Sequence, residues 1–99
     1  MRPLLPYRWT ETALEQAQEI FDYLAMTRSE RSVDRLRGEL GRLVEDVRRF
    51  PGMFVRSERI KGAREIHLDR YVILYTVEND EILIVNMVHG MRDWVRPRD

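Results

Sequence analysis

The chain has 99 residues, which suits one domain built around one hydrophobic core. It carries 17 basic and 17 acidic residues and no cysteine. The lack of cysteine excludes disulfides and thiolate chemistry and is typical of a reducing cytoplasm. Lys61 is the single lysine, so 17 − 1 = 16 of the basic residues are arginine. A net charge of zero does not favour nucleic-acid binding through phosphate neutralisation alone.

Metal, cofactor and membrane sites are not indicated. The two histidines, His67 and His89, lie far apart in the sequence. Two prolines interrupt the start of the chain, so it does not form a signal peptide. No segment approaches the ~20 apolar residues of a membrane span. We therefore expect residues 1–99 to form a single cytoplasmic domain that uses no cofactor and no metal.

A short β-prone piece at residues 7–10 precedes the first amphipathic helix. Thr10 or Thr12 is expected to cap this helix, and Thr12 with Glu15 fits a capping box. Helical spacing predicts one buried face, formed by Leu14, Ala17, Phe21 and Leu24.

A second helix is predicted to follow, with Ser29 as its cap, and to end before Pro51. Gly38 and Gly41 are expected to let the first helix approach closely. Two helices joined by a short connection form a hairpin. The apolar stripe of the second helix comprises Val33, Leu36, Leu40, Leu43, Val47 and Phe50.

The rest of the chain has the periodicity of strands. The strands are predicted at residues 53–60, 64–68, 71–77 and 82–88, with a hairpin turn at 78–81. Short connections favour antiparallel pairing. The sum is an α+β two-layer fold, in which a short N-terminal strand and a helical hairpin pack with an antiparallel β-sheet.

Three segments taken together resemble the ParE/RelE toxin superfamily, and the ParE branch more than the RelE branch. They are "WTETALEQAQEIFDYLA", a helix ending in "RRFP", and "REIHLDRYVILYTVENDEILIVNMVHGMRDW". The resemblance implies the toxin of a type II toxin–antitoxin pair, neutralised by a small cognate antitoxin in a hetero-oligomeric complex. It also implies plasmid stabilisation and, for the ParE branch, DNA gyrase as the target. Members of the RelE branch cleave mRNA on the ribosome.

The nuclease alternative needs a base, a cation and an acid. Arg64 stands where the resemblance places a catalytic arginine, His89 stands near the acid, and Glu58 or Glu65 would be the base. The sequence departs from the nuclease pattern in its single lysine, in the tryptophan near its end, and in its zero net charge. The alternative interpretation of Arg64 is an ion pair with Glu58 or another acid at the sheet edge.

The interpretation we favour is a binding toxin without catalytic chemistry. Its antitoxin is expected to cover the exposed sheet edge and the apolar rim of the helical hairpin. We expect the contacts with target or partner to come from Arg64, His89, Arg92 and Trp94, with Arg35 and Arg42 as outer contacts. The alternatives are a structural role for each residue, such as Trp94 closing the core, or a non-toxic regulatory domain of the same fold.

Arginines recur every seven residues in the second helix, at Arg28, Arg35, Arg42 and Arg49. This basic stripe suits an acidic antitoxin segment or a nucleic-acid target. It equally suits a solvated face, because three i,i+4 pairs would neutralise much of the charge. Those pairs are Arg35 with Glu39, Arg42 with Asp46, and Glu45 with Arg49.

Overall fold

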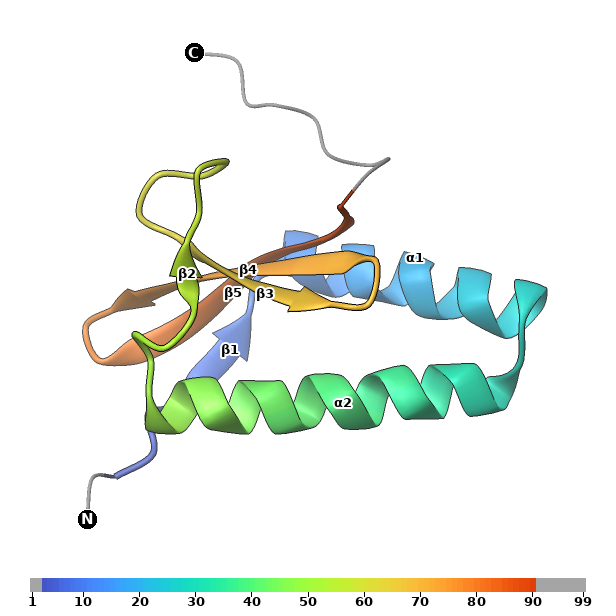
Figure 1. Ribbon diagram of the computed structural model, residues 1–99, viewed down its shortest axis with the longest axis horizontal. Helices are drawn as coiled ribbons and strands as arrows, with labels where there is room; N and C mark the ends of the chain where they lie inside the picture. The colour runs from blue at the N-terminus through green and yellow to red at the C-terminus, as the bar shows by residue number, and fades with distance from the viewer. Residues whose placement is uncertain (1–2, 91–99) are drawn as a thin grey trace.

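The computed structural model describes residues 3–90, and its arrangement confirms the predicted α+β class. Two helices and the sheet form two layers (Figure 1). No helix in the described part of the chain is long and apolar enough to cross a membrane. The elements in chain order are β1 (Tyr7–Trp9), α1 (Glu11–Thr27), α2 (Glu30–Arg49), β2 (Val55–Arg56), β3 (Arg64–Leu68), β4 (Tyr71–Glu78) and β5 (Glu81–His89).

The sheet is mixed, with the strand order β1-β5-β4-β3-β2. Strands β2 to β5 pair antiparallel, as predicted, whereas β1 lies parallel to β5, with Arg8 opposite Leu83. Two parallel strands need a long connection, and here the segment from α1 to β4 connects β1 with β5. The predicted strand at residues 53–60 is reduced to Val55–Arg56, because residues 57–63 leave the sheet edge.

The hairpin between β4 and β5 has the turn chemistry that its sequence predicts. Asn79 and Asp80 both have positive φ, at 51° and 58°. Two such residues between paired strands make a type I′ turn, whose twist matches that of the strands. The pair Glu78–Glu81 closes the turn and sets the register of the two longest strands.

A β-bulge in β5 marks where α1 meets the sheet. Leu74 pairs with Asn86 and Tyr75 pairs with Ile84, which leaves Val85 as the extra residue. Strand β1 pairs with β5 only as far as Ile84, and beyond that point α1 contacts the edge of β5. The side-chain oxygen of Gln16 accepts a hydrogen bond from the backbone N–H of Met87 at 2.9 Å.

The helix starts are fixed by side-chain caps. Thr10 accepts a hydrogen bond from Ala13 N at 3.1 Å, so the cap of α1 is Thr10 and not Thr12. Ser29 caps α2, as predicted, by accepting from Ser32 N. Each cap satisfies a backbone N–H that the helix itself leaves unpaired.

The predicted buried face of α1 is wrong at Leu14, which is 55% exposed. Ala13, Ala17 and Leu24 are the buried residues of this helix, so the small alanines and not Leu14 meet the sheet. In α2 the stripe is confirmed from Val33 to Val47, but Phe50 follows the last helical residue and is exposed.

The glycines of α2 do not allow a close helix approach. A Cβ at Gly38 or at Gly41 would meet nothing within 4 Å. Both positions therefore border open space, and the expectation of close helix packing at these glycines is wrong.

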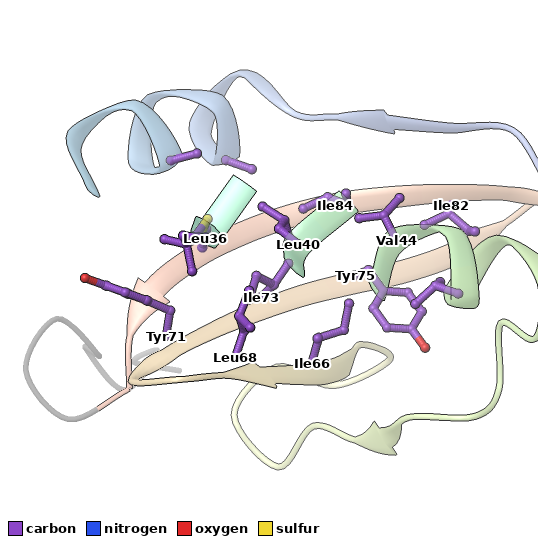
Figure 2. Packing of buried hydrophobic residues seen from close by; sticks show 14 of the residues in the cluster. Leu36, Leu40, Val44, Ile66, Leu68, Tyr71, Ile73, Tyr75, Ile82 and Ile84 are labelled. Atoms are coloured by element: carbon purple, nitrogen blue, oxygen red, sulfur yellow. The ribbon is translucent and has the colours of Figure 1, made fainter. Parts of the chain in front are cut away.

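Strand β4 is buried on both faces. Ile73 and Tyr75 point to the helices and join the main core, where Leu36, Leu40 and Val44 of α2 lie above the sheet (Figure 2). On the opposite side, which we call the open face, a smaller apolar cluster contains Val72, Leu74, Val88 and Ala63. Ala63 comes from the segment 57–63, so this segment covers the open face much as the helices cover the other.

We predict that Gln16→Ala destabilises the protein by about 1–3 kcal/mol, because it leaves the N–H of Met87 without its partner. Urea denaturation measures the loss. Gln18→Ala is the matched control, since Gln18 is exposed and its side-chain amide donates a hydrogen bond to the exposed Asp22, and its effect should stay within about 0.5 kcal/mol. Equal effects of the two changes would contradict the role given to Gln16.

Candidate partner-binding groove

A groove runs between residues 14–21 of α1, residues 37–44 of α2 and β1. We call it the hairpin groove; its volume is about 500 Å³. Its wall is mostly apolar, and several of its large side chains are exposed or half-buried. The lining residues are Tyr7, Trp9, Leu14, Ala17, Gln18, Phe21, Arg37, Leu40, Gly41 and Val44.

Small residues explain why the groove stays open. Ala17 and Gly41 face it from opposite helices, and neither fills the space between them. Leu14 then forms an exposed part of its wall, while Phe21 is half-buried and packs against the edge of the core. An exposed apolar surface with this shape is typical of a protein-binding site.

Arginines flank the apolar wall. The guanidinium of Arg37 lies over the ring of Phe21, 4.6 Å from its centroid, and that of Arg48 lies 5.3 Å from the centroid of Tyr7. Arg48 also donates to the carbonyl of Leu5 at 2.8 Å and pairs with Glu45 at 2.8 Å. The groove is therefore apolar inside and basic along part of its rim.

Arg64 has a structural partner. Its guanidinium donates to the carbonyl oxygen of Phe54 at 2.7 Å, so it pairs with the backbone and not, as one interpretation held, with Glu58. Next to it, the hydroxyl of Tyr75 donates to the carbonyl of Pro51 at 2.7 Å. Together these two bonds tie the segment between α2 and β2 to the sheet.

Glu65 is the one buried charged residue in the described chain, at 7% exposure, and it lies on the open face. It accepts hydrogen bonds from Ser57 at 2.7 Å and shares one of 2.8 Å with His67. Arg59 lies 3.7 Å away. Burial raises the pKa of Glu65, but the hydrogen bonds from Ser57 and His67 and the charge of Arg59 outweigh it. The pKa therefore lies below its ordinary value of 4.5.

The same cluster fixes segment 57–63. Ser57 Oγ accepts from the backbone N–H groups of Arg59 and Ile60, each at 3.0 Å, while donating to Glu65. The backbone of Ser57 also bonds to that of Ala63. Glu65 thus anchors the cover of the open face through its side chain.

The proposed nuclease residues are not brought together. Arg64 pairs across the sheet with Tyr75, and His89 pairs with Tyr71. Tyr71 and Tyr75 are four residues apart in β4, so Arg64 and His89 lie roughly 13 Å apart along that strand. Glu65 lies on the other face from both. Glu58 is exposed in the segment after β2.

His89 ends β5 beside Tyr71, with ring centroids 5.8 Å apart and planes nearly perpendicular. Arg35 and Arg42 are exposed on α2. Of the three predicted i,i+4 pairs only Arg35–Glu39 forms, at 3.8 Å. Glu45 pairs with Arg48 instead of Arg49, since i,i+3 neighbours also face each other. Arg92 and Trp94 lie outside the described residues.

The sequence predicted an apolar rim on the helical hairpin but not its composition. The signal available was the pair of glycines in α2, which lie beside the apolar stripe and provide no side chain there. The glycines predict a close helix contact, which does not form. The spacing of Leu14 from Ala17 and Phe21 predicts a place in the core, but spacing alone does not separate a residue of the core from one that lines a groove.

A family model described as "ParE toxin of type II toxin-antitoxin system, parDE" matches residues 7–94. A solved chromosomal ParDE system from P. aeruginosa has a similar fold, with a TM-score of 0.74 at 18% identity; the match covers 87% of this chain and 96% of that chain. The RelBE2 toxin–antitoxin complex from Mycobacterium tuberculosis gives a TM-score of 0.61 at 16% identity, over 88% of this chain and 99% of that one. No curated protein matches the sequence.

We predict that Glu65→Gln lowers the free energy of unfolding by about 1–2 kcal/mol at neutral pH, because the substituted amide is a poorer acceptor for Ser57 and His67. The folded-state pKa of Glu65 is lowered, so the stabilisation by its charge is present above pH 4.5 and is lost as the pH falls through the folded-state pKa. Urea denaturation at a series of pH values should show the two proteins converging in acid. Glu58→Gln, at an exposed position, is the control, and a pH-independent difference for Glu65→Gln would contradict the assignment.

Proposed function

The chain belongs to the family of ParE toxins of type II toxin–antitoxin systems, and we propose that it acts by binding DNA gyrase and is neutralised by an antitoxin seated in the hairpin groove. The observation that carries the antitoxin part is the groove itself. It exposes Leu14 and Tyr7 beside Phe21 and leaves the space above Gly41 empty. An amphipathic segment that lays its apolar side into such a groove is a recurrent mode of peptide recognition.

The charges along the groove favour an acidic partner. Arg37 lines the groove and Arg48 lies over Tyr7 at its edge. Carboxylates flanking an apolar stripe would pair with the guanidinium of Arg37, whereas Arg48 is already paired with Glu45. The two similar structures are described as a toxin–antitoxin system and a toxin–antitoxin complex, which supports a partner of this kind for the present chain.

Binding without catalysis is supported by the separation of the candidate catalytic groups. Arg64 is bonded to Phe54, and Glu65 is enclosed by Ser57, Arg59 and His67 on the opposite face. The RelE-like activity, cleavage of mRNA on the ribosome, is the second candidate, and a non-toxic regulatory domain is the third. The proposed target contacts remain Arg64, His89, Arg92 and Trp94, with Arg35 and Arg42 further out. On this proposal the protein works in the cytoplasm, where gyrase and mRNA are found.

The target is tested by expressing the chain without antitoxin. We expect growth arrest with loss of negative supercoiling, and inhibition of purified gyrase by the purified chain. Normal DNA topology with rapid mRNA cleavage would instead establish the nuclease activity. Normal growth, with soluble protein present, would leave the regulatory domain as the explanation.

The groove is tested with Gly41→Leu. The position has room for a side chain, and leucine has a higher helix propensity than glycine by roughly 1 kcal/mol, so the chain should fold at least as stably. The leucine would fill the groove, and affinity for the cognate antitoxin should fall at least tenfold while toxicity persists. Isothermal titration and growth rescue measure the two effects.

Gly38→Leu is the matched control, because Gly38 also borders open space but does not line the groove. This variant should still be rescued by the antitoxin. If the antitoxin rescued Gly41→Leu equally well, the groove would not be its binding site, whatever the target of the toxin.

A further inference from the structure

Exposed apolar side chains gather at one end of the molecule, where the β4–β5 turn, the C-terminal end of α2 and the N-terminal segment meet (Figure 1). Single exposed apolar residues are ordinary on a protein surface, whereas a group of them marks a contact surface. We call this group the turn-end patch. Its members are Leu4, Phe50, Met53 and Val77, which are 39%, 56%, 53% and 40% exposed. None of the four lines the hairpin groove.

Hydrogen bonds join the segment after α2 to the end of β4. The hydroxyl of Tyr75 donates to the carbonyl of Pro51 at 2.7 Å, and Phe50 directly precedes this proline. Val77 follows Tyr75 on the same face of β4, because alternate residues of a strand point the same way. The backbone N–H of Met53 donates to the carbonyl of Phe50 at 3.1 Å, which closes the segment into a turn. Three of the four apolar side chains are therefore held at one place.

The N-terminal segment is fixed against the same end of α2. The backbone N–H of Leu5 donates to the carbonyl of Arg48 at 3.1 Å, and the guanidinium of Arg48 donates to the carbonyl of Leu5 at 2.8 Å. The carbonyl of Pro6 accepts from the backbone N–H of Ile82, near the β4–β5 turn, at 2.9 Å. Leu4 is thus held at the same end of the molecule as the other three members of the patch.

Charged side chains of both signs border the patch. Arg49 is the last residue of α2, and Arg56 is the last residue of β2. Glu78 and Asp80 belong to the β4–β5 hairpin, next to Val77. All four are exposed, and none makes an ion pair with another residue among 3–90. The patch therefore has an apolar centre, a basic border along the segment after α2 and an acidic border at the turn.

We propose that the turn-end patch is the contact surface of a weak symmetric dimer of this chain. In a two-fold dimer the same patch meets itself, so each border of one copy lies opposite the other border of its partner. The apolar centres then bury each other, and the arginines of one copy face the acids of the other. Four partly exposed apolar side chains are few for an obligate interface, so the dimer is a weak one.

The balance of charge favours a second copy over other partners. The border carries two unpaired bases and two unpaired acids, so it complements itself. A partner of one sign, such as an acidic peptide or a nucleic acid, would be repelled by half of these charges. The net charge of the whole chain is zero, which removes the long-range repulsion that keeps copies of a charged protein apart.

The experiment measures the mass of the full-length chain, without antitoxin, by sedimentation equilibrium at concentrations up to about 1 mM, the dissociation constant of a weak interface. We expect a reversible equilibrium between monomer and dimer, in which the share of dimer rises with concentration.

Two complementary variants test the charges. Arg49→Glu with Arg56→Glu makes the border wholly acidic, and Glu78→Arg with Asp80→Asn makes it wholly basic; asparagine tolerates the positive φ of 58° at position 80. Each variant alone should dimerise at least about tenfold more weakly than the parent chain, because like charges then face each other. An equimolar mixture of the two should associate as tightly as the parent chain, because opposite charges face each other again. Misfolding of either variant could not produce this recovery.

Phe50→Ser with Met53→Ser tests the apolar centre and should also weaken dimerisation at least about tenfold. Met26→Ser is the matched control, because Met26 is 87% exposed and lies near the end of α1, outside the patch. This control should leave the dimer unchanged.

A chain that stays monomeric at about 1 mM, or a dimer that persists equally in the charge variants and the apolar variant, would overturn the proposal. A mixture of the two folded charge variants that fails to associate would overturn it as well. If a monomeric chain lost antitoxin binding or gyrase inhibition through Phe50→Ser with Met53→Ser, the patch would belong to that partner and not to a second copy. The mass of the chain does not depend on toxicity, so the proposed function and the dimer can each fail separately.

Discussion

The burial of β4 on both faces is the constraint on which the rest of the structure depends. Residues Tyr71 to Tyr75 are all buried, so each face of the strand requires its own cover. The helical hairpin covers one face, and the short segment 57–63 covers the other. A segment that short has few apolar side chains to bury, so it is held by polar bonds, and Glu65 supplies them. The burial of β4 thus leads to a buried carboxylate, that of Glu65. Its ionised form is tolerated there because Ser57, His67 and Arg59 surround it.

The helices do not cover their side of the molecule completely, because small residues leave space between them. Alanines at positions 13 and 17 let α1 lie close to the sheet, and α2 packs with larger residues such as Leu36 and Leu40. Where the two helices should meet each other, Gly41 contributes no side chain, and Phe21 is covered by the guanidinium of Arg37. The core is therefore completed between each helix and the sheet, and a hollow remains between the helices. The faces of the two helices that meet the sheet stabilise the fold, and the faces that line the hollow are available to a partner.

Much of the fold follows from local signals. The stripe of α2, the alternation in β3, the apolar run of β4 and the Asn79-Asp80 turn each predict their element, since each depends on neighbours in sequence. The failures have one cause in common, which is contact between distant segments. The exposure of Leu14 depends on how α2 lies across α1. The burial of Glu65 depends on segment 57–63 folding back over the apolar cluster of the open face.

Arg64 and Glu65 are the residues that most resemble catalytic groups in the sequence, and in the structure they are adjacent anchors. They point to opposite faces of β3, as alternation requires, and each holds one of the two segments that flank β2. Arg64 holds the chain before β2 and Glu65 holds the chain after it. A strand of two residues has too few ladder hydrogen bonds to fix its own position, so these side chains fix it instead. The charged pair thus has a sufficient structural reason to be present. The hairpin groove has no such reason, because Gly41 leaves it unfilled and Leu14 stays exposed along its wall, so it is a surface left for a partner.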